Sequence, residues 1–203
     1  MVLGFDTSAA HCAAAVVSGG RLLVYRWEPM TRGQAERLLP LLEEVLAEAG
    51  LGWGDLAALG VGTGPGNFTG TRIAVAAARG LALGAGIPAE GVTSMEALSE
   101  GRDDVIVCLP ASRGQVHLGR ADDIRTIAAG APLSSDWTGP LTGPAAALVA
   151  EWTGRTVRTA PDLATAIARI ADGRAGPGRP RPAPIYLRAA DAAPSSDMPP
   201  VIL

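Results

Sequence analysis

The chain has 203 residues, of which 48% are hydrophobic and 18% charged, and its formal net charge is -3. All 17 basic residues are arginines, which excludes a P-loop lysine, a Schiff-base lysine and a lysine general base. The mild acidity argues against a protein that grips nucleic acid with its own surface, because such binding depends on clustered cations. No apolar run approaches the roughly 20 residues that span a bilayer, and the first residues lack a signal peptide's basic flank. We therefore expect a cytoplasmic protein whose Cys12 and Cys108, both in apolar runs, are buried and reduced.

The first half of the chain predicts three short strands and then an alternation of helices and strands. Residues 2–6, 11–17 and 21–27 are separated by turn residues and indicate an antiparallel meander. An amphipathic helix is expected over 34–49, with Pro40 inside it, and a buried strand over 56–61. A glycine-rich loop, a helix over 68–85, a strand at 91–93 and a short helix from Met95 follow. This order is typical of a ribonuclease-H-like α/β lobe.

The second half repeats the pattern faintly. Residues 105–109 and 116–119 indicate strands and 162–171 a helix, which suggests a duplicated two-lobed protein with a shortened second lobe. We place the first lobe at 1–101 and the second at 102–182, with the boundary at the polar cluster 100–104. Glycine, proline and arginine alternate over 172–184 and predict a semi-extended linker. Residues 183–203 are expected to return to the first lobe and to end in a flexible tail.

Asp6, Thr7 and Ser8 follow the first predicted strand and are candidate contacts for an anion or a nucleotide. The alternative is a turn in which Asp6 bonds its own backbone, favoured by about two to one on position alone. His11 and His117 have no acidic or cysteine partner at ligand spacing, so we expect neither a metal site nor a catalytic nucleophile paired with a histidine.

The glycine-rich loop at 62–72 is the most informative run. It leaves a strand and enters a helix that Thr69 or Thr71 can cap, so its N–H groups and the helix dipole form a plausible anion site around Gly64, Gly66 and Asn67. It is not a Walker A motif and lacks the Gly-x-Gly-x-x-Gly spacing. A strand-to-helix turn that needs positive φ explains the glycines equally well.

The two long helices of the first half carry a candidate partner interface. Small residues form a stripe on the second helix, and each helix glycine costs roughly 1 kcal/mol relative to alanine, which suggests close approach by another backbone. The first helix offers a leucine-rich stripe. The alternative is that both stripes pack on the sheet. The candidate interface residues are Leu38, Leu42, Val45, Ile73, Ala77, Gly80 and Gly84.

Several of these runs resemble one family. Residues 64–72, Gly-Pro-Gly-Asn-Phe-Thr-Gly-Thr-Arg, are similar to the Gly-Pro-Gly-Ser-Phe-Thr-Gly-x-Arg signature of the bacterial TsaB (YeaZ) proteins. Asp6-Thr7-Ser8, the Leu-Leu-Pro at 38–40, the Gly-Leu-Ala at 80–82, the run at 91–98 and the Pro-Ile-Tyr-Leu-Arg at 184–188 also match. The resemblance is dense over 1–100 and thin from there to 183.

The resemblance implies a two-lobed fold related to actin, sugar kinases and chaperone ATPases (the ASKHA fold). It also implies a non-catalytic partner of the transferase TsaD, acting with the ATPase TsaE in threonylcarbamoyladenosine modification of tRNA beside the anticodon. The pairing would use the two first-lobe helices, tRNA would be contacted through the complex, and a homodimer would form without the partner. No cofactor would bind tightly, although ATP or ADP would fit the partner interface.

The second lobe departs from the family pattern. Where relatives show Asp-Ala-Arg-x-Gly-Glu-Val-Tyr, residues 110–117 read Pro-Ala-Ser-Arg-Gly-Gln-Val-His, which puts any nucleotide contact at that turn in doubt. An active ASKHA-type small-molecule kinase or ATPase is the alternative, and its weak candidate for an adenosine motif is 138–144. A metallopeptidase, an older label for the wider family, lacks a ligand cluster.

Overall fold

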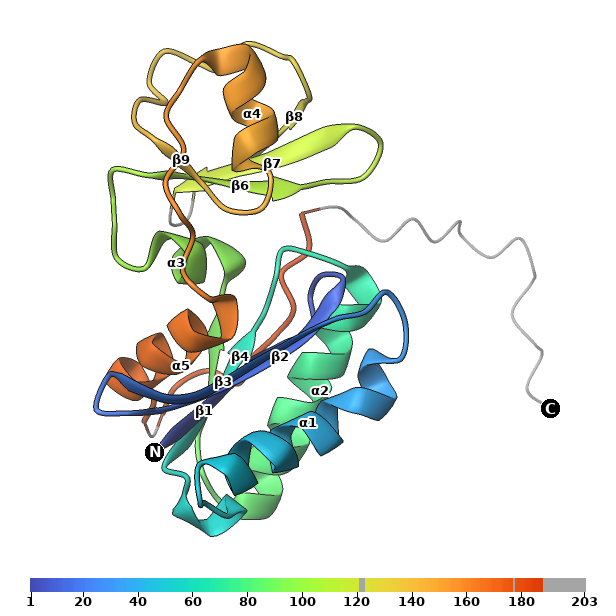
Figure 1. Ribbon diagram of the computed structural model, residues 1–203, viewed down its shortest axis with the longest axis vertical. Coiled ribbons are helices and arrows are strands. Elements are labelled where there is room, and N and C mark those ends of the chain that lie inside the picture. The colour runs from blue at the N-terminus through green and yellow to red at the C-terminus, as the bar shows by residue number, and fades with distance from the viewer. Residues whose placement is uncertain (121–122, 177, 188–203) are drawn as a thin grey trace, which may run out of the picture.

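The computed structural model describes residues 1–120, 123–176 and 178–187, and these form two lobes around two β-sheets (Figure 1). The larger sheet has the strand order β3-β2-β1-β4-β5. Strands β1 (Val2–Asp6), β2 (His11–Ser18) and β3 (Arg21–Pro29) form the predicted antiparallel meander, and β4 (Ala58–Gly62) and β5 (Ala89–Val92) add to it in parallel. The parallel pairing of β1 with β4 places the end of β1 beside the glycine-rich loop that follows β4.

One face of this sheet is covered by α1 (Gln34–Glu48) and α2 (Phe68–Ala85), as Figure 1 shows. The buried leucines and Val45 of α1 meet the apolar side chains of the sheet in the largest core cluster of the described residues. Pro40 lies inside α1 without ending it. A short 3₁₀ helix, η1 (Trp53–Asp55), leads from α1 into β4. The predicted bounds of both long helices agree with the structure to within one residue.

The opposite face is covered by α5 (Leu163–Arg174), which corrects the predicted domain division. Residues 102–182 were expected to form the second lobe, but α5 packs on β1, β2 and β4. Its alanines lie so close to the sheet that a Cβ on Gly4 would stand 2.6 Å from the carbonyl oxygen of Ala164. The first lobe therefore recruits a helix from far along the chain, which sequence order alone does not reveal.

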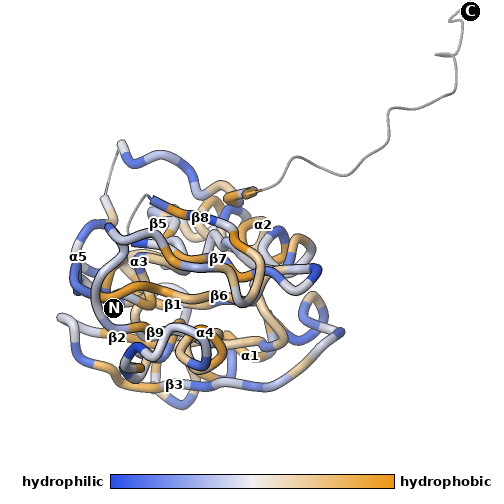
Figure 2. The backbone as a smooth tube through the Cα atoms, turned by 90° about the horizontal axis from the view of Figure 1, so that it is seen from above, coloured by the Kyte–Doolittle hydropathy of each residue, from blue (hydrophilic) through white to orange (hydrophobic). Residues whose placement is uncertain are grey.

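The smaller sheet has the order β8-β7-β6-β9 and belongs to the second lobe. It contains β6 (Ile106–Pro110), β7 (Gln115–Arg120), β8 (Asp123–Ala128) and the two-residue β9 (Leu141–Thr142), with α4 (Ala146–Thr153) against it. The sequence predicted β6 and β7 but missed β8, β9 and α4. Figure 2 shows this sheet lying over the first when seen from above, with hydrophobic residues along β6 and β7.

The two lobes meet at α3 (Ser94–Ser99), which a capping box between Thr93 and Glu96 starts. Its Met95 and Leu98 pack with Val107 and Leu109 of the second sheet. On its other side, α3 contacts α5. Each lobe therefore shares part of its apolar core with the other.

The segment 178–187 runs back along the first lobe, as the red end of the described chain in Figure 1 shows. The backbone N–H of Ile185 donates to the carbonyl of Thr63, just after β4, at 2.9 Å. The predicted flexible tail, from residue 188, lies outside the described residues. Within the described part of the chain, no helix has the length and hydropathy needed to cross a bilayer.

Candidate functional site

Asp6 ends β1 with a carboxylate that is completely buried. Its Oδ1 accepts hydrogen bonds from the backbone N–H and the hydroxyl of Ser8, both at 2.9 Å. The same oxygen lies 2.8 Å from Nε2 of His11, so the histidine has the acidic partner that its sequence spacing did not suggest. The cause is the turn between β1 and β2, which folds residue 11 back beside residue 6. Oδ2 lies against Gly62 and has no hydrogen-bond partner among the described residues.

The glycine-rich loop lies directly on this turn. The Asn67 N–H donates to the carbonyl of Ser8 at 2.5 Å, and the Thr7 hydroxyl donates to the carbonyl of Gly70 at 2.7 Å. A Cβ on Gly66 would collide with Ser8, and one on Gly70 with Thr7. The glycines at these two positions therefore permit backbone-to-backbone contact, and Gly64 adopts a positive φ of 84°.

This packing corrects two site predictions. Asp6, Thr7 and Ser8 are at most 3% exposed and bond to their own turn and loop, so they offer no side chain to a ligand in this conformation. The helix is capped by Asn67, whose Oδ1 accepts from the Gly70 N–H at 2.9 Å, and neither Thr69 nor Thr71 is the cap. Thr71 instead donates its hydroxyl to the Asn67 carbonyl.

The structure brings these candidate residues together, but some of them are buried and the others are exposed. Asp6, Thr7, Ser8 and Gly64 are buried, whereas Gly66, Asn67 and Thr69 lie at the surface. The cap of α2 already uses one N–H group at the helix start, because the Asn67 side chain accepts from Gly70. Any anion would therefore approach from the outer side of the loop, away from the buried Asp6 carboxylate, whose charge would repel it.

A cluster that sequence reasoning missed stands beside the loop. The Arg72 guanidinium lies 3.6 Å from the centroid of the Phe68 ring, and its Nε donates to the Tyr186 hydroxyl at 2.8 Å. The Phe68 and Tyr186 rings are 5.2 Å apart, and each residue is nearly half exposed. The signal was present as two separate motifs, the run at 64–72 and the late Tyr-Leu. Only the fold shows that they contact each other.

The residues of the candidate partner interface also include both buried and exposed ones. Leu38, Leu42 and Val45 are at most 1% exposed and pack in the core of this chain, so they are wrong as partner contacts. Gly80 and Gly84 are exposed, and a Cβ on either would meet nothing within 4 Å. Ile73 and Ala77 lie between these extremes, at the edge of the core.

The outward side of α2 is therefore a surface of small and apolar residues. We call it the open face of α2, and it consists of Ala76, Gly80, Leu83 and Gly84. Leu83 is 82% exposed, and together with its small neighbours it makes this side of the helix a continuous apolar surface. On α1, Leu39 is also exposed, at 46%.

The second lobe offers little room around the weak candidate for an adenosine motif. A Cβ on Gly139 would collide with the Asp104 carbonyl, and one on Gly143 would stand 2.8 Å from the Cys108 carbonyl. Thr142 is fully buried in β9. The middle of the run is therefore packed against the rest of the lobe, whereas Thr138, Gly139 and Pro144 are exposed. In the described part of the chain, no three His, Cys, Asp or Glu side chains gather as metal ligands would.

Both cysteines are free and buried, as expected. Burial raises the pKa of Cys12 to about 11 and that of Cys108 to about 12. Both therefore carry protonated, weakly reactive thiols at neutral pH.

Comparison with known proteins places these features in a family. The protein-family model described as TsaD, tRNA N6-adenosine threonylcarbamoyltransferase, matches residues 28–166 of this chain. The TsaB protein of Escherichia coli K12 is 33% identical over 122 residues, which are 57% of this chain and 52% of that protein. The chain belongs to the TsaB (YeaZ) family. It spans about half the length of the E. coli TsaB protein that it matches.

Two other proteins match over nearly their whole length. An uncharacterized protein of Mycobacterium tuberculosis is 35% identical over 204 residues, covering 95% of this chain and 94% of that protein. The crystal structure of a Pseudomonas aeruginosa protein with similarity to the peptidase YeaZ superposes with a TM-score of 0.74 at 25% identity, covering 92% of this chain and 99% of that one.

More distant structures show the fold alone. Component A of the (R)-2-hydroxyglutaryl-CoA dehydratase of Acidaminococcus fermentans has a TM-score of 0.54 at 11% identity, over 85% of this chain and 97% of that one. The two-lobed ASKHA-like architecture predicted from the sequence is therefore confirmed.

Proposed function

We propose that this chain is a non-catalytic partner of a TsaD-type transferase in the threonylcarbamoyladenosine modification of tRNA. The observation that carries the proposal is the open face of α2 in a member of the TsaB family, because its two glycines have open space where a Cβ would stand. A glycine inside a helix lowers stability relative to alanine, and two glycines one turn apart on one exposed face would allow another backbone to pack close to that face.

The pairing surface differs from the one predicted from sequence. The buried Leu38, Leu42 and Val45 hold α1 on the sheet and thereby position the outer side of the helix. The partner would contact the open face of α2 and the exposed Leu39 of α1, where apolar surface remains accessible to solvent. Burying that surface favours association, since each Å² of apolar area contributes roughly 25 cal/mol before the costs of binding.

The remaining parts of the proposal concern the larger assembly. A TsaE-type ATPase would join the pair, tRNA would be contacted mainly by the partners, and the same helices would form a homodimer when the paralogue is absent. A nucleotide at the partner interface would meet the exposed Gly66, Asn67 and Thr69 of the loop, because Asp6 is buried. We infer no tightly bound cofactor for the chain by itself.

The test is complex formation with the cognate paralogue. The two proteins are mixed at micromolar concentration and separated by size-exclusion chromatography with light scattering. Gly80→Leu and Gly84→Leu place a large side chain on the open face and are expected to abolish co-elution. Gly173→Leu is the matched control, because Gly173 is also an exposed helix glycine with nothing near its Cβ position but lies in α5.

Each result of this experiment has a different interpretation. Co-elution that survives in Gly173→Leu and is lost in both α2 variants supports the pairing surface. If the wild-type proteins do not co-elute, the partner role is wrong. If all variants co-elute alike, the chain is a partner through a different surface.

A further inference from the structure

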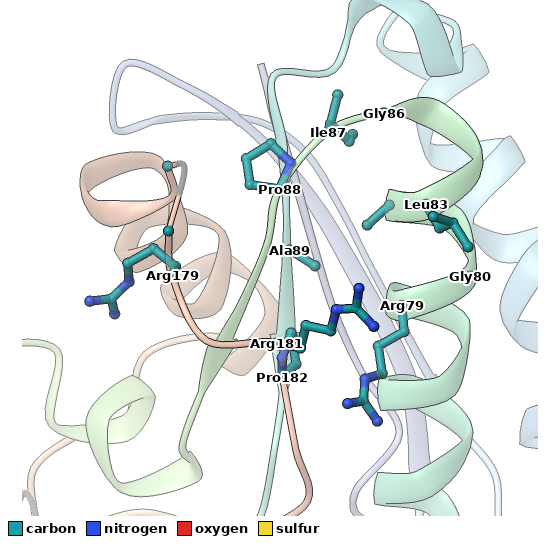
Figure 3. A pocket seen from close by; sticks show the side chains of 13 residues that line it. Arg79, Gly80, Leu83, Gly86, Ile87, Pro88, Ala89, Arg179, Arg181 and Pro182 are labelled. Carbon is teal, nitrogen blue, oxygen red and sulfur yellow. The ribbon is translucent and has the colours of Figure 1, made fainter.

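A groove opens on the side of α2 that faces β5. It lies between the C-terminal half of the helix, the turn into β5 and the returning segment 178–182, and its volume is about 780 Å³. Leu83, Ile87, Pro88 and Pro182 provide apolar walls (Figure 3). A volume of this size holds a ligand of several residues or a mononucleotide.

The groove carries unbalanced positive charge. Figure 3 shows the side chains of Arg79 and Arg181 extending into the space between α2 and the returning segment. Neither guanidinium has a carboxylate or other hydrogen-bonding partner among the described residues. Arg179 also lines the groove but points the other way and binds Glu90 at 2.7 Å. Two unpaired arginines in a chain of net charge -3 form a local site for an anion.

The C-terminal end of α2, where Leu83, Gly86 and Ile87 line the groove, adds hydrogen-bond acceptors. The N–H of Ile87 donates to Ala82, five residues back, and residue 88 is a proline without an N–H. The carbonyls of Leu83 and Gly84 therefore lack their usual donors four residues on. The helix dipole also gives this end partial negative charge, so any anionic group of a ligand belongs at the two arginines and not directly against the helix end.

A ligand that suits the groove must therefore offer carboxylates, N–H donors and apolar side chains together. We propose that the groove binds an extended acidic segment of a protein partner, with carboxylates on Arg79 and Arg181 and backbone N–H groups at the C-terminal end of α2. The apolar walls would take hydrophobic side chains between the acids. Arg–carboxylate pairs of this kind can be bidentate, which gives them strength and direction.

The experiment measures binding of the full chain to an array of capped dodecapeptides built from Asp, Leu, Pro and Ser, with increasing aspartate content. Binding is expected to rise with aspartate count and to weaken as salt increases. The best peptide is then measured in solution by fluorescence anisotropy. Arg79→Glu and Arg181→Glu should each weaken it by at least about tenfold, because each reversal replaces an attraction with a repulsion.

Arg21→Glu is the matched control. Arg21 is an exposed arginine on β3, at the opposite edge of the first sheet from β5, and it should leave peptide affinity within about twofold. Gly80 and Leu83 line this groove and also belong to the open face of α2, so the two proposals share part of one surface. Gly84→Leu separates them, because Gly84 belongs to the open face but is not among the residues that line the groove, so this variant should lose co-elution with the paralogue and keep peptide affinity. Thermal melts check that the variants fold.

Three outcomes would overturn the proposal. Peptide binding that does not rise with aspartate content contradicts the charge argument. Equal affinity in Arg79→Glu, Arg181→Glu and wild type places the bound peptide elsewhere. Binding of ADP or a single-stranded oligonucleotide that is lost in the same two variants, with no peptide binding, assigns the groove to phosphate.

Discussion

The two faces of the first sheet use glycine in opposite ways. On the face covered by α5, Gly4 and Gly60 let the helix backbone approach the strands so closely that a Cβ would stand within 3 Å of α5 atoms. On the outer side of α2, which covers the other face, Gly80 and Gly84 have no neighbour within 4 Å. Gly4 and Gly60 allow close packing within this chain, whereas Gly80 and Gly84 leave part of the surface of α2 without a neighbour. The contrast separates what folds the lobe from what remains available to a partner.

The largest expected effect comes from filling the tight face. Gly4→Ala places a Cβ 2.6 Å from the Ala164 oxygen and from the Ala168 nitrogen, which are backbone atoms that cannot rotate away. We expect the free energy of unfolding to fall by about 3 kcal/mol, because overpacking here must displace α5. Urea denaturation followed by far-UV circular dichroism measures the change.

Gly173→Ala is the control for that variant. It adds the same methyl group within α5 itself, where nothing lies within 4 Å, and should change stability by no more than about 1 kcal/mol, in the stabilising direction. Equal effects of the two substitutions would show that α5 does not pack on the sheet as closely as described.

A smaller effect is expected where ion pairs hold the end of α5 on the same face. Glu90 of β5 has a side chain only 4% exposed, and its Oε1 lies 2.7 Å from Arg174 of α5 and 2.7 Å from Arg179. Glu90→Gln removes the negative charge that both arginines pair with. We expect a loss of about 2 kcal/mol in the free energy of unfolding, below the usual cost of breaking a buried pair because both arginines are partly exposed.

Glu100→Gln tests whether burial is the reason. Glu100 pairs with Arg169 of α5 at 2.7 Å, but both side chains are substantially exposed, so the loss should stay below about 0.5 kcal/mol. Both variants are compared by the urea midpoint at constant slope. Similar losses in the two variants would indicate that charge alone, and not burial, sets the contribution.

The comparison also explains how far the fold could be predicted from sequence. The meander was predicted, and the two long helices, expected over 34–49 and 68–85, were predicted to within one residue, because these patterns are local and strongly periodic. The placement of α5 was missed because the sequence of the helix does not indicate which strands it packs against. Gly4 and Gly60, inside buried strands, were the available signal of a close backbone approach. In the second lobe, β9 has only two residues, too few to show a period.

The candidate site follows the same division between local and distant information. The glycine-rich loop and the turn at residues 6–8 were identified from composition, and the structure joins them. The sequence did not show which of the candidate residues are exposed to solvent. An Asp at the end of a strand and a leucine stripe on a helix have the same sequence pattern whether they face solvent or the core. The pairing of Arg72 with Tyr186 spans 114 residues, so only the three-dimensional arrangement shows it.

The last prediction, and the one that most sharpens the contrast, is Gly80→Ala. In the isolated chain it should raise the free energy of unfolding by about 1 kcal/mol, since alanine favours the helix and its Cβ meets nothing. In the complex with the paralogue, the same methyl group should weaken binding by on the order of tenfold, because it holds the partner's backbone away. Urea denaturation and titration calorimetry measure the two effects on one protein. Opposite signs would show that Gly80 is retained for association at a cost to folding, whereas a stabilised variant that binds the paralogue at wild-type affinity would place the interface away from the open face of α2.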